Sequence, residues 1–181
     1  MEEPCHYNER KEKEKELNTA MKKLISFILI LMLIACTAWA EEPKKEEYRP
    51  LGETGFEMWI APGMQTVELT QEDLDNGYIQ YYEDSTRTKA IAVVYFTDIS
   101  LTLEEYKSYL DGDTTVTDIG ITEVNGIPCI RYQMSLEGFD ILNVAFVLEN
   151  SDILEVTFSP YDDPDYAGTI ETMYSSIRKT K

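Results

Sequence analysis

Residues 116–159 constrain the fold most strongly, because they alternate apolar and polar side chains over four runs separated by short turns. Asn125-Gly126, between the first two runs, is the dipeptide most typical of a tight hairpin. Alternation with a period of two places successive side chains on opposite faces of a strand. We therefore expect a meander of four antiparallel strands, at residues 116–124, 127–136, 139–148 and 152–159.

Three further strands are expected upstream, at residues 56–60, 78–83 and 89–97. The run 89–97 is apolar at consecutive positions, which indicates a central strand that is buried on both faces. Residues 66–77 are ambiguous, although Thr70 followed by Asp73 can cap one short helical turn.

Two helices complete the expected architecture. Thr102 and Glu105 match a capping box, and Asp111-Gly112 ends the helix that follows. A last helix begins with Pro164 as its first residue and carries a stripe of apolar residues. That stripe consists of Ile170, Met173, Tyr174 and Ile177. The sequence predicts an α+β fold in which helices flank a single antiparallel β-sheet of about six to seven strands.

Residues 21–40 have the parts of a secretory signal peptide: Lys22 and Lys23, an apolar run, and the end Ala38-Trp39-Ala40. Residues 1–20 are charged and precede this signal, so we interpret them as a non-native extension before a start at Met21. Residues 41–54 are expected to be a flexible tether. The folded domain is expected at residues 55–181.

Two alternatives for this leader stay open. Residues 33–36, Leu-Ile-Ala-Cys, resemble a bacterial lipobox, in which Cys36 would be lipidated and anchor the protein. Alternatively, residues 24–40 remain uncleaved as an anchor helix, at the lower limit of about 17 residues for spanning a bilayer. Each alternative places the domain outside the cytoplasm, secreted or membrane-anchored, and any membrane contact would be made through the leader.

Composition excludes several chemistries. The leader carries equal numbers of acidic and basic residues, so the net charge of −18 belongs entirely to residues 41–181. Such a domain is expected to repel nucleic acid. The only histidine, His6, lies in the leader, which excludes a Ser-His-Asp triad and an imidazole metal site from the domain. Cys129 is the domain's single cysteine and cannot form an internal disulfide.

Three stretches carry a resemblance to a known family: GFEMWIAP at 55–62, NGIPCIRY at 125–132, and VTFSP at 156–160, followed by a helix that contains Ser175-Ser176-Ile177. With the order of elements, they resemble the PsbP-like superfamily, which includes photosystem II extrinsic subunits and bacterial secreted lipoproteins. The resemblance implies an antiparallel sheet flanked by helices and an accessory or binding role outside the cytoplasm. It transfers no catalytic residue, because the superfamily shares a scaffold rather than a chemistry.

Aromatic residues on the expected strands are the first candidates for a binding surface, since tyrosine favours interfaces. They are Trp59, Tyr78, Tyr81, Tyr82, Tyr95 and Tyr132. The same side chains can instead pack under a helix. Acidic clusters at 111–113 and 162–165 can supply oxygen ligands to calcium or serve as caps and turns.

We therefore expect a non-enzymatic extracytoplasmic binding or accessory domain without a cofactor. Its partner is expected to be an unidentified protein or small molecule. The alternatives are a small hydrolase that uses carboxylates and a cell-surface module stabilised by calcium.

Overall fold

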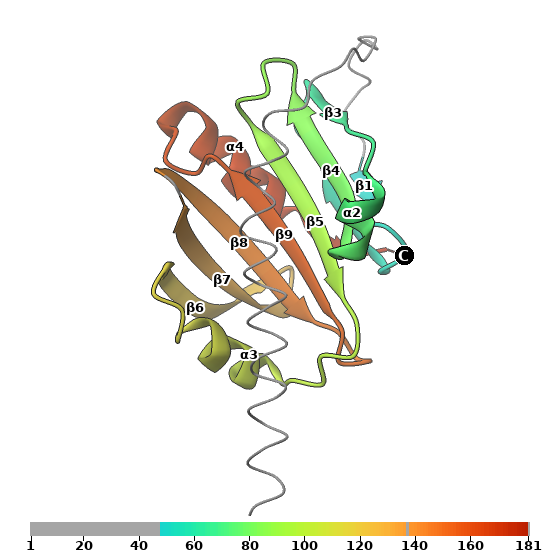
Figure 1. Ribbon diagram of the computed structural model, residues 1–181, viewed down its shortest axis with the longest axis vertical. Coiled ribbons are helices and arrows are strands. Elements are labelled where there is room, and N and C mark those ends of the chain that lie inside the picture. Colours follow the sequence, from blue (N-terminus) through green and yellow to red (C-terminus); the bar gives the residue numbers. More distant parts are fainter. Residues whose placement is uncertain (1–47, 137, 181) are drawn as a thin grey trace, which may run out of the picture. The chain divides into compact units, whose positions relative to one another are not determined.

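The computed structural model describes residues 48–136 and 138–180 of the chain (Figure 1). Seven strands form one antiparallel sheet in the order β3-β4-β5-β9-β8-β7-β6. They are β3 (Met64–Thr66), β4 (Tyr78–Asp84), β5 (Ala90–Phe96), β6 (Val116–Val124), β7 (Ile127–Leu136), β8 (Phe139–Val147) and β9 (Ile153–Ser159). The predicted α+β class, the antiparallel sheet and its C-terminal meander are confirmed.

Capping interactions begin each described helix: α2 (Gln71–Asp75), α3 (Leu103–Leu110) and α4 (Pro164–Ser175). Thr70 and Thr102 each form the capping box that the sequence predicts, and Asp163 caps α4 ahead of Pro164. The expected apolar stripe extends past the end of α4. Ile177 is fully buried but follows the helix, because the chain turns there toward a further strand.

The turn between β6 and β7 has the geometry that the Asn-Gly dipeptide predicts. Asn125 and Gly126 have φ angles of 51° and 75°, as a type I′ turn requires. The Asn125 side chain also donates hydrogen bonds of 2.9 and 2.8 Å to the carbonyls of Ser175 and Ile177. This hairpin is therefore fastened to the C-terminal end of α4.

A second sheet of three strands joins the two ends of the domain, in the order β1 (Tyr48–Pro50), β2 (Phe56–Trp59) and β10 (Arg178–Lys179). The first expected strand therefore belongs to this small sheet rather than to the large one. The tether expected at 41–54 also needs correction: Tyr48–Pro50 is a strand, and Leu51 is fully buried in the core. The pairing of β1 with β2 and the burial of Leu51 order this part of the segment despite its polar composition.

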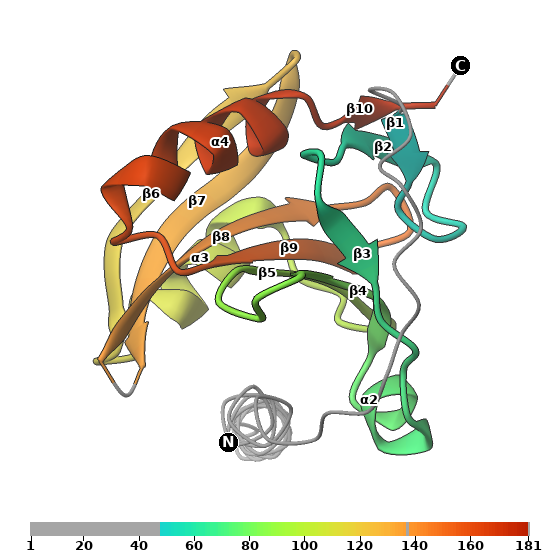
Figure 2. The same ribbon diagram turned by 90° about the horizontal axis from the view of Figure 1, so that it is seen from above.

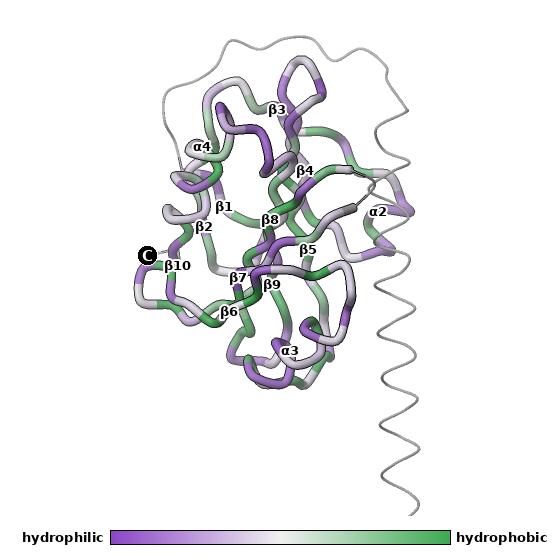
Figure 3. Tube along the Cα trace, turned by 90° about the vertical axis from the view of Figure 1, so that its left-hand side faces the viewer, coloured by the Kyte–Doolittle hydropathy of each residue, from purple (hydrophilic) through white to green (hydrophobic). Residues whose placement is uncertain are grey.

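The seven-stranded sheet has two unlike faces. Figure 2 shows the sheet from above, with α4, β1, β2 and β10 on one side and α2 on the other. We call the side under α4 the inner face; it contributes Ile91, Val93, Leu142, Val144, Phe146, Leu154, Val156 and Phe158 to the core. From α4, Tyr166, Ile170 and Met173 pack against it. In Figure 3, hydrophobic residues concentrate along the strands and hydrophilic ones along α3 and the loops.

The predicted extension, signal peptide and lipidation site at Cys36 lie outside the described residues, as do residues 41–47 of the expected tether. Within 48–136 and 138–180, no helix combines the length and the apolar content needed to cross a membrane.

Candidate binding face

The other side of the seven-stranded sheet, the outer face, carries two neighbouring rows of paired residues. One row runs from β7 to β4 and the second lies beside it. The rows are Tyr132, Asn143, Thr157, Ala92 and Tyr81, and Ile130, Ala145, Glu155, Val94 and Tyr78. Residues that pair across strands share a face. A register shift in β4 between Tyr78 and Gln80 brings Tyr78 and Tyr81 onto the same face.

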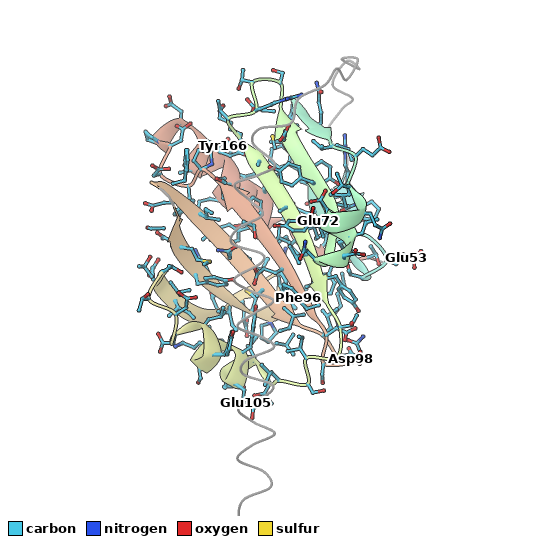
Figure 4. All side chains as sticks on the ribbon, in the orientation of Figure 1. Glu53, Glu72, Phe96, Asp98, Glu105 and Tyr166 are labelled. Carbon is cyan, nitrogen blue, oxygen red and sulfur yellow. The ribbon has the colours of Figure 1, made fainter. Side chains whose placement is uncertain are left out.

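Two short helices accompany the outer face, which is turned toward the viewer in Figures 1 and 4. In these views α2, marked by Glu72, lies over β4, whereas α3, marked by Glu105, lies at the lower end of the sheet. The arrangement places side chains of α2 and α3 at opposite borders of the two rows.

Glu155 is the buried carboxylate of this face, with 3% of its surface exposed. Its Oε2 accepts hydrogen bonds from the hydroxyls of Tyr132, at 2.8 Å, and Tyr106 of α3, at 3.1 Å. Burial raises the pKa of the Glu155 carboxyl, while the two hydroxyl donors oppose this rise. Burial and the Glu155 carboxylate also hold the pKa values of Tyr106 and Tyr132 well above their ordinary value. Both tyrosines therefore remain protonated donors.

Asn143 lies directly across from Thr157, whose hydroxyl donates a 2.8 Å hydrogen bond to the Asn143 side-chain oxygen. Asn143 is only 2% exposed, yet its Nδ2 has no hydrogen-bond partner in the described part of the chain. Two N–H donors are therefore left unused on the outer face.

Tyr78 and Asp73 form a second group with unused polar atoms, at the β4 border. The Tyr78 hydroxyl and Oδ1 of Asp73 lack hydrogen-bond partners among the described residues, although the two residues are 1% and 0% exposed. Oδ2 of Asp73 is occupied, since it accepts 2.7 Å bonds from Thr70 N and Oγ1. Burial raises the pKa values of Tyr78 and Tyr81, and the Asp73 charge raises both further. The helix that carries Asp73, α2, packs against β4, which carries both tyrosines.

Unused polar atoms of this kind are unfavourable in a folded protein. Leaving a buried donor or acceptor without a partner costs roughly 1–3 kcal/mol, and such groups are few in native structures. In the described residues, the atoms concerned are Nδ2 of Asn143, the Tyr78 hydroxyl, Oδ1 of Asp73 and Oε1 of Gln80. The first two lie on the outer face, and the third lies beside it. Because two of these four atoms lie on the outer face, on β8 and β4, and a third lies beside it, we take the outer face as the candidate site.

The predicted aromatic surface does not exist as one exposed surface, which corrects that expectation. Tyr78, Tyr81 and Tyr132 are buried on the outer face. Tyr82 is buried in the core on the inner face, because consecutive strand residues point to opposite faces. The remaining two lie elsewhere: Trp59 is in the small sheet, and Tyr95 at the end of β5 donates a hydrogen bond to Asp152.

Sequence reasoning missed the polar residues that now stand out: Asp73, Tyr106, Asn143, Glu155 and Thr157. No sequence signal marks Glu155 or Asn143, because each alternates with apolar neighbours and a polar residue in an alternating strand is usually exposed. The burial of every residue of β9 is known only from the structure.

The acidic clusters act locally as caps and turns. Oδ1 of Asp113 accepts bonds from the amide and hydroxyl of Thr115, at 2.8 and 2.7 Å. Asp163 caps α4 by accepting from the Asp165 amide at 2.9 Å. In residues 48–136 and 138–180, no three side chains of His, Cys, Asp or Glu gather closely enough to hold a metal ion.

Cys129 lies fully buried among the core residues of the inner face. Burial, with a smaller contribution from the Glu123 charge, raises the pKa of its thiol to about 11. The thiolate is the reactive form of cysteine, so Cys129, which stays protonated, is unreactive at neutral pH.

Neither the comparison with protein-family models nor that with curated proteins gives a match. Among solved structures, the domain is similar to cyanobacterial PsbP (CyanoP) from Synechocystis sp. PCC 6803. The TM-score is 0.56 at 14% identity, over 82% of this chain and 99% of the other. At that identity the likeness concerns the fold alone. Together with the antiparallel sheet and its flanking helices, it establishes that this chain has the PsbP-like fold.

Proposed function

We propose that this protein is an extracytoplasmic, non-enzymatic binding or accessory domain that holds a small polar ligand on its outer face. The observation that carries the proposal is the group of unused polar atoms on Asp73, Tyr78 and Asn143. Each of these atoms is buried, so a ligand would reach them only where the covering side chains move aside, and its hydrogen bonds would then offset the burial of these groups. The PsbP-like fold is compatible with an accessory role.

Binding is favoured over carboxylate catalysis by the surroundings of Glu155. A general acid or base exchanges a proton with its substrate, and its neighbours must permit both protonation states. Glu155 is instead fixed as an acceptor by two tyrosines that remain protonated. Its bonds tie α3 to the sheet, which is a structural task.

The binding proposal is tested by thermal unfolding against a panel of sugars, polyols, amines, amino acids and organic acids. At least one class should raise the melting temperature of the wild-type domain. Tyr78→Phe, which removes only the unused hydroxyl, should weaken that response. Tyr48→Phe is the matched control, since it removes the hydroxyl of an exposed tyrosine in the small sheet. No response from any class, or an equal response in Tyr78→Phe, would contradict the proposal.

The extracytoplasmic location rests on the signal-peptide pattern at residues 21–40. Intact mass and N-terminal sequencing of the protein from its host test it. A chain that begins at Glu41 would be a diffusible protein, and a lipid-modified Cys36 would place it at the membrane surface. A chain that retains residues 1–40 within the cytoplasm would refute the location.

A further inference from the structure

We propose that the free edge of β6 binds an extended, basic segment of a partner protein, which continues the seven-stranded sheet as a further strand. This inference goes beyond the proposed function and does not depend on it, because it concerns a strand edge rather than the buried atoms of the outer face. It is carried by the length of the edge, the direction of its backbone groups and the side chains that it exposes.

Among the described residues, β6 is the longest strand at a sheet edge. The edge strands are β3 and β6 in the large sheet, and β1 and β10 in the small one. β1 and β3 have three residues each and β10 has two, whereas β6 has nine. A very short edge strand offers few hydrogen bonds to an incoming strand, which is one way in which proteins protect their edges. β6 lacks this protection.

The first half of β6 is protected in another way. Its pairing with β7 shifts register between Thr117 and Gly120, where Asp118 has a φ angle of 48°. Such irregularities disturb the edge and hinder the addition of a strand. From Gly120 to Val124 the pairing with β7 is regular. The part of the edge that is open to a further strand is therefore the second half of β6.

The turn between β6 and β7 determines which backbone groups of this half are free. In a two-residue hairpin turn the flanking residues, here Val124 and Ile127, form a hydrogen-bonded pair. Bonded and non-bonded pairs then alternate along an antiparallel ladder, so Thr122 also bonds to β7. The N–H and C=O groups of Ile121 and Glu123 therefore point away from β7, toward the free edge.

The side chains along this half of the edge are exposed. Ile121, at 45%, is one of four exposed large apolar side chains in the described residues, and Thr122 and Glu123 beside it are exposed as well. Ile121 and Glu123 point to the same face, because they stand two positions apart in a strand. An added strand would therefore place one side chain against Ile121 and another, two residues along, against Glu123.

Charge selects a basic partner. No ion pair joins Glu123 to a basic side chain in residues 48–136 and 138–180, and the domain carries the whole net charge of −18. A lysine or arginine opposite Glu123 would be favourable, as opposite charges on facing strands are. A second copy of this chain would instead bring two strongly acidic domains together, which disfavours self-pairing. An extended segment at a sheet edge is recognised by main-chain hydrogen bonds together with such side-chain contacts.

A symmetrical peptide, Thr-Lys-Thr-Val-Thr-Lys-Thr with blocked ends, tests the proposal, because in either direction it can offer valine to Ile121 and lysine to Glu123. Fluorescence anisotropy of the labelled peptide should show binding to the wild-type protein. The same peptide with glutamate in place of both lysines should bind about tenfold more weakly or not at all. If the protein binds neither peptide, or both equally well, the proposal is wrong.

Methylated peptides distinguish strand addition from general attraction to an acidic protein. The N–H groups of successive strand residues point to opposite edges. Methylation of the lysine and valine amide nitrogens therefore blocks one edge of the peptide, and methylation of the threonine amide nitrogens blocks the other. One of these two peptides should lose affinity by about tenfold or more, while the other keeps it. Equal affinities of the two methylated peptides would refute strand addition.

Three variants of the protein locate the binding edge. Ile121→Pro removes an outward N–H at a position where an edge strand tolerates proline, and it should weaken peptide binding about tenfold or more. Glu123→Gln should weaken it about threefold. Glu104→Gln, the matched control, removes the same charge from an exposed position on α3 and should leave the affinity unchanged. Equal effects of the two glutamine variants would refute β6 as the site.

A further variant and a further measurement cover the remaining outcomes. If Ile121→Pro does not fold, Ile121→Lys replaces it, because lysine on an edge strand hinders strand addition, and it should weaken binding by a similar factor. Sedimentation of the protein without peptide should show a monomer. Self-association that Ile121→Lys abolishes would mean that a second copy occupies the edge, which would overturn the basic partner. The response of Tyr78→Phe to the small-molecule panel decides the proposed function separately.

Discussion

Both faces of the seven-stranded sheet are buried, but they bury different kinds of side chain. The inner face meets α4 and the small sheet with apolar side chains throughout its centre. The outer face buries Asn143, Glu155 and Thr157 at positions that alternate with those core residues. Apolar burial is favourable at roughly 25 cal/mol per Å², whereas polar burial is at best neutral when every group is paired.

This contrast separates stability from function. On the inner face, substitutions should act through packing alone. On the outer face, the paired residues Glu155, Tyr106 and Tyr132 should contribute stability, whereas the unpaired Tyr78 and Asn143 should lower it. Unpaired buried groups lower stability, so their presence at Tyr78 and Asn143 is a reason to look for a ligand on the outer face.

Removal of a core ring on the inner face should have the largest effect. Phe158 is fully buried near the C-terminal end of β9, and Phe158→Ala should lower the free energy of unfolding by about 3–5 kcal/mol. Phe139→Ala is the matched control on β8, where the ring is 44% exposed, and it should cost about 1 kcal/mol or less. Urea denaturation of both variants measures the difference. Similar losses would mean that the inner face is not the main core.

The second largest loss of stability is expected when the buried carboxylate of the outer face is removed. Glu155→Ala leaves the hydroxyls of Tyr106 and Tyr132 without an acceptor and should lower the free energy of unfolding by about 2–4 kcal/mol. Glu155→Gln keeps an acceptor oxygen and should remain within about 1 kcal/mol of the wild type at pH 5. Chemical denaturation again provides the measurement. If the Gln variant is as unstable as the Ala variant, the two hydrogen bonds are not what stabilises this face.

The pH dependence of stability should reveal the same carboxyl. Burial raises the pKa of Glu155 in the folded protein above its ordinary value of 4.5, so the folded state holds the proton at pH values where the unfolded chain has lost it. Stability from this group is present below about pH 4.5 and falls as pH rises through the folded pKa. Relative to Glu155→Gln, the wild type should lose stability across that window. A difference that does not change with pH would contradict the raised pKa.

The smallest effect is expected where a group is unpaired. Tyr78→Phe removes a buried hydroxyl that has no partner, and it should leave stability unchanged or raise it by up to about 1 kcal/mol. Tyr132→Phe removes a hydroxyl that bonds to Glu155 and should lower stability by about 1 kcal/mol. Thermal unfolding compares the two. A marked loss in Tyr78→Phe would show that its hydroxyl is satisfied in solution.

The sequence predicted the elements better than the site. Asn125-Gly126, the capping residues Thr70 and Thr102, and the alternation in the meander are local signals, and each has the predicted structure. The small sheet was missed because β10 is only two residues long and pairs with a strand more than a hundred positions earlier. Which of Tyr81 and Tyr82 faces the core depends on a register shift in β4, which no local pattern reveals. The unused atoms of the outer face are likewise a property of long-range packing.

The small sheet holds the two ends of the domain together, because β2 is paired on one side with β1, the first described strand, and on the other with β10, the last. Arg178 reinforces the closure through an ion pair with Glu57 and a position over the Tyr48 ring. If either β1 or β10 detached, one edge of β2 would lose its hydrogen-bonded neighbour. The domain is therefore a natural candidate for circular permutation: a short linker between residues 180 and 48, with new ends in an exposed turn such as Thr86–Thr88, should preserve the fold.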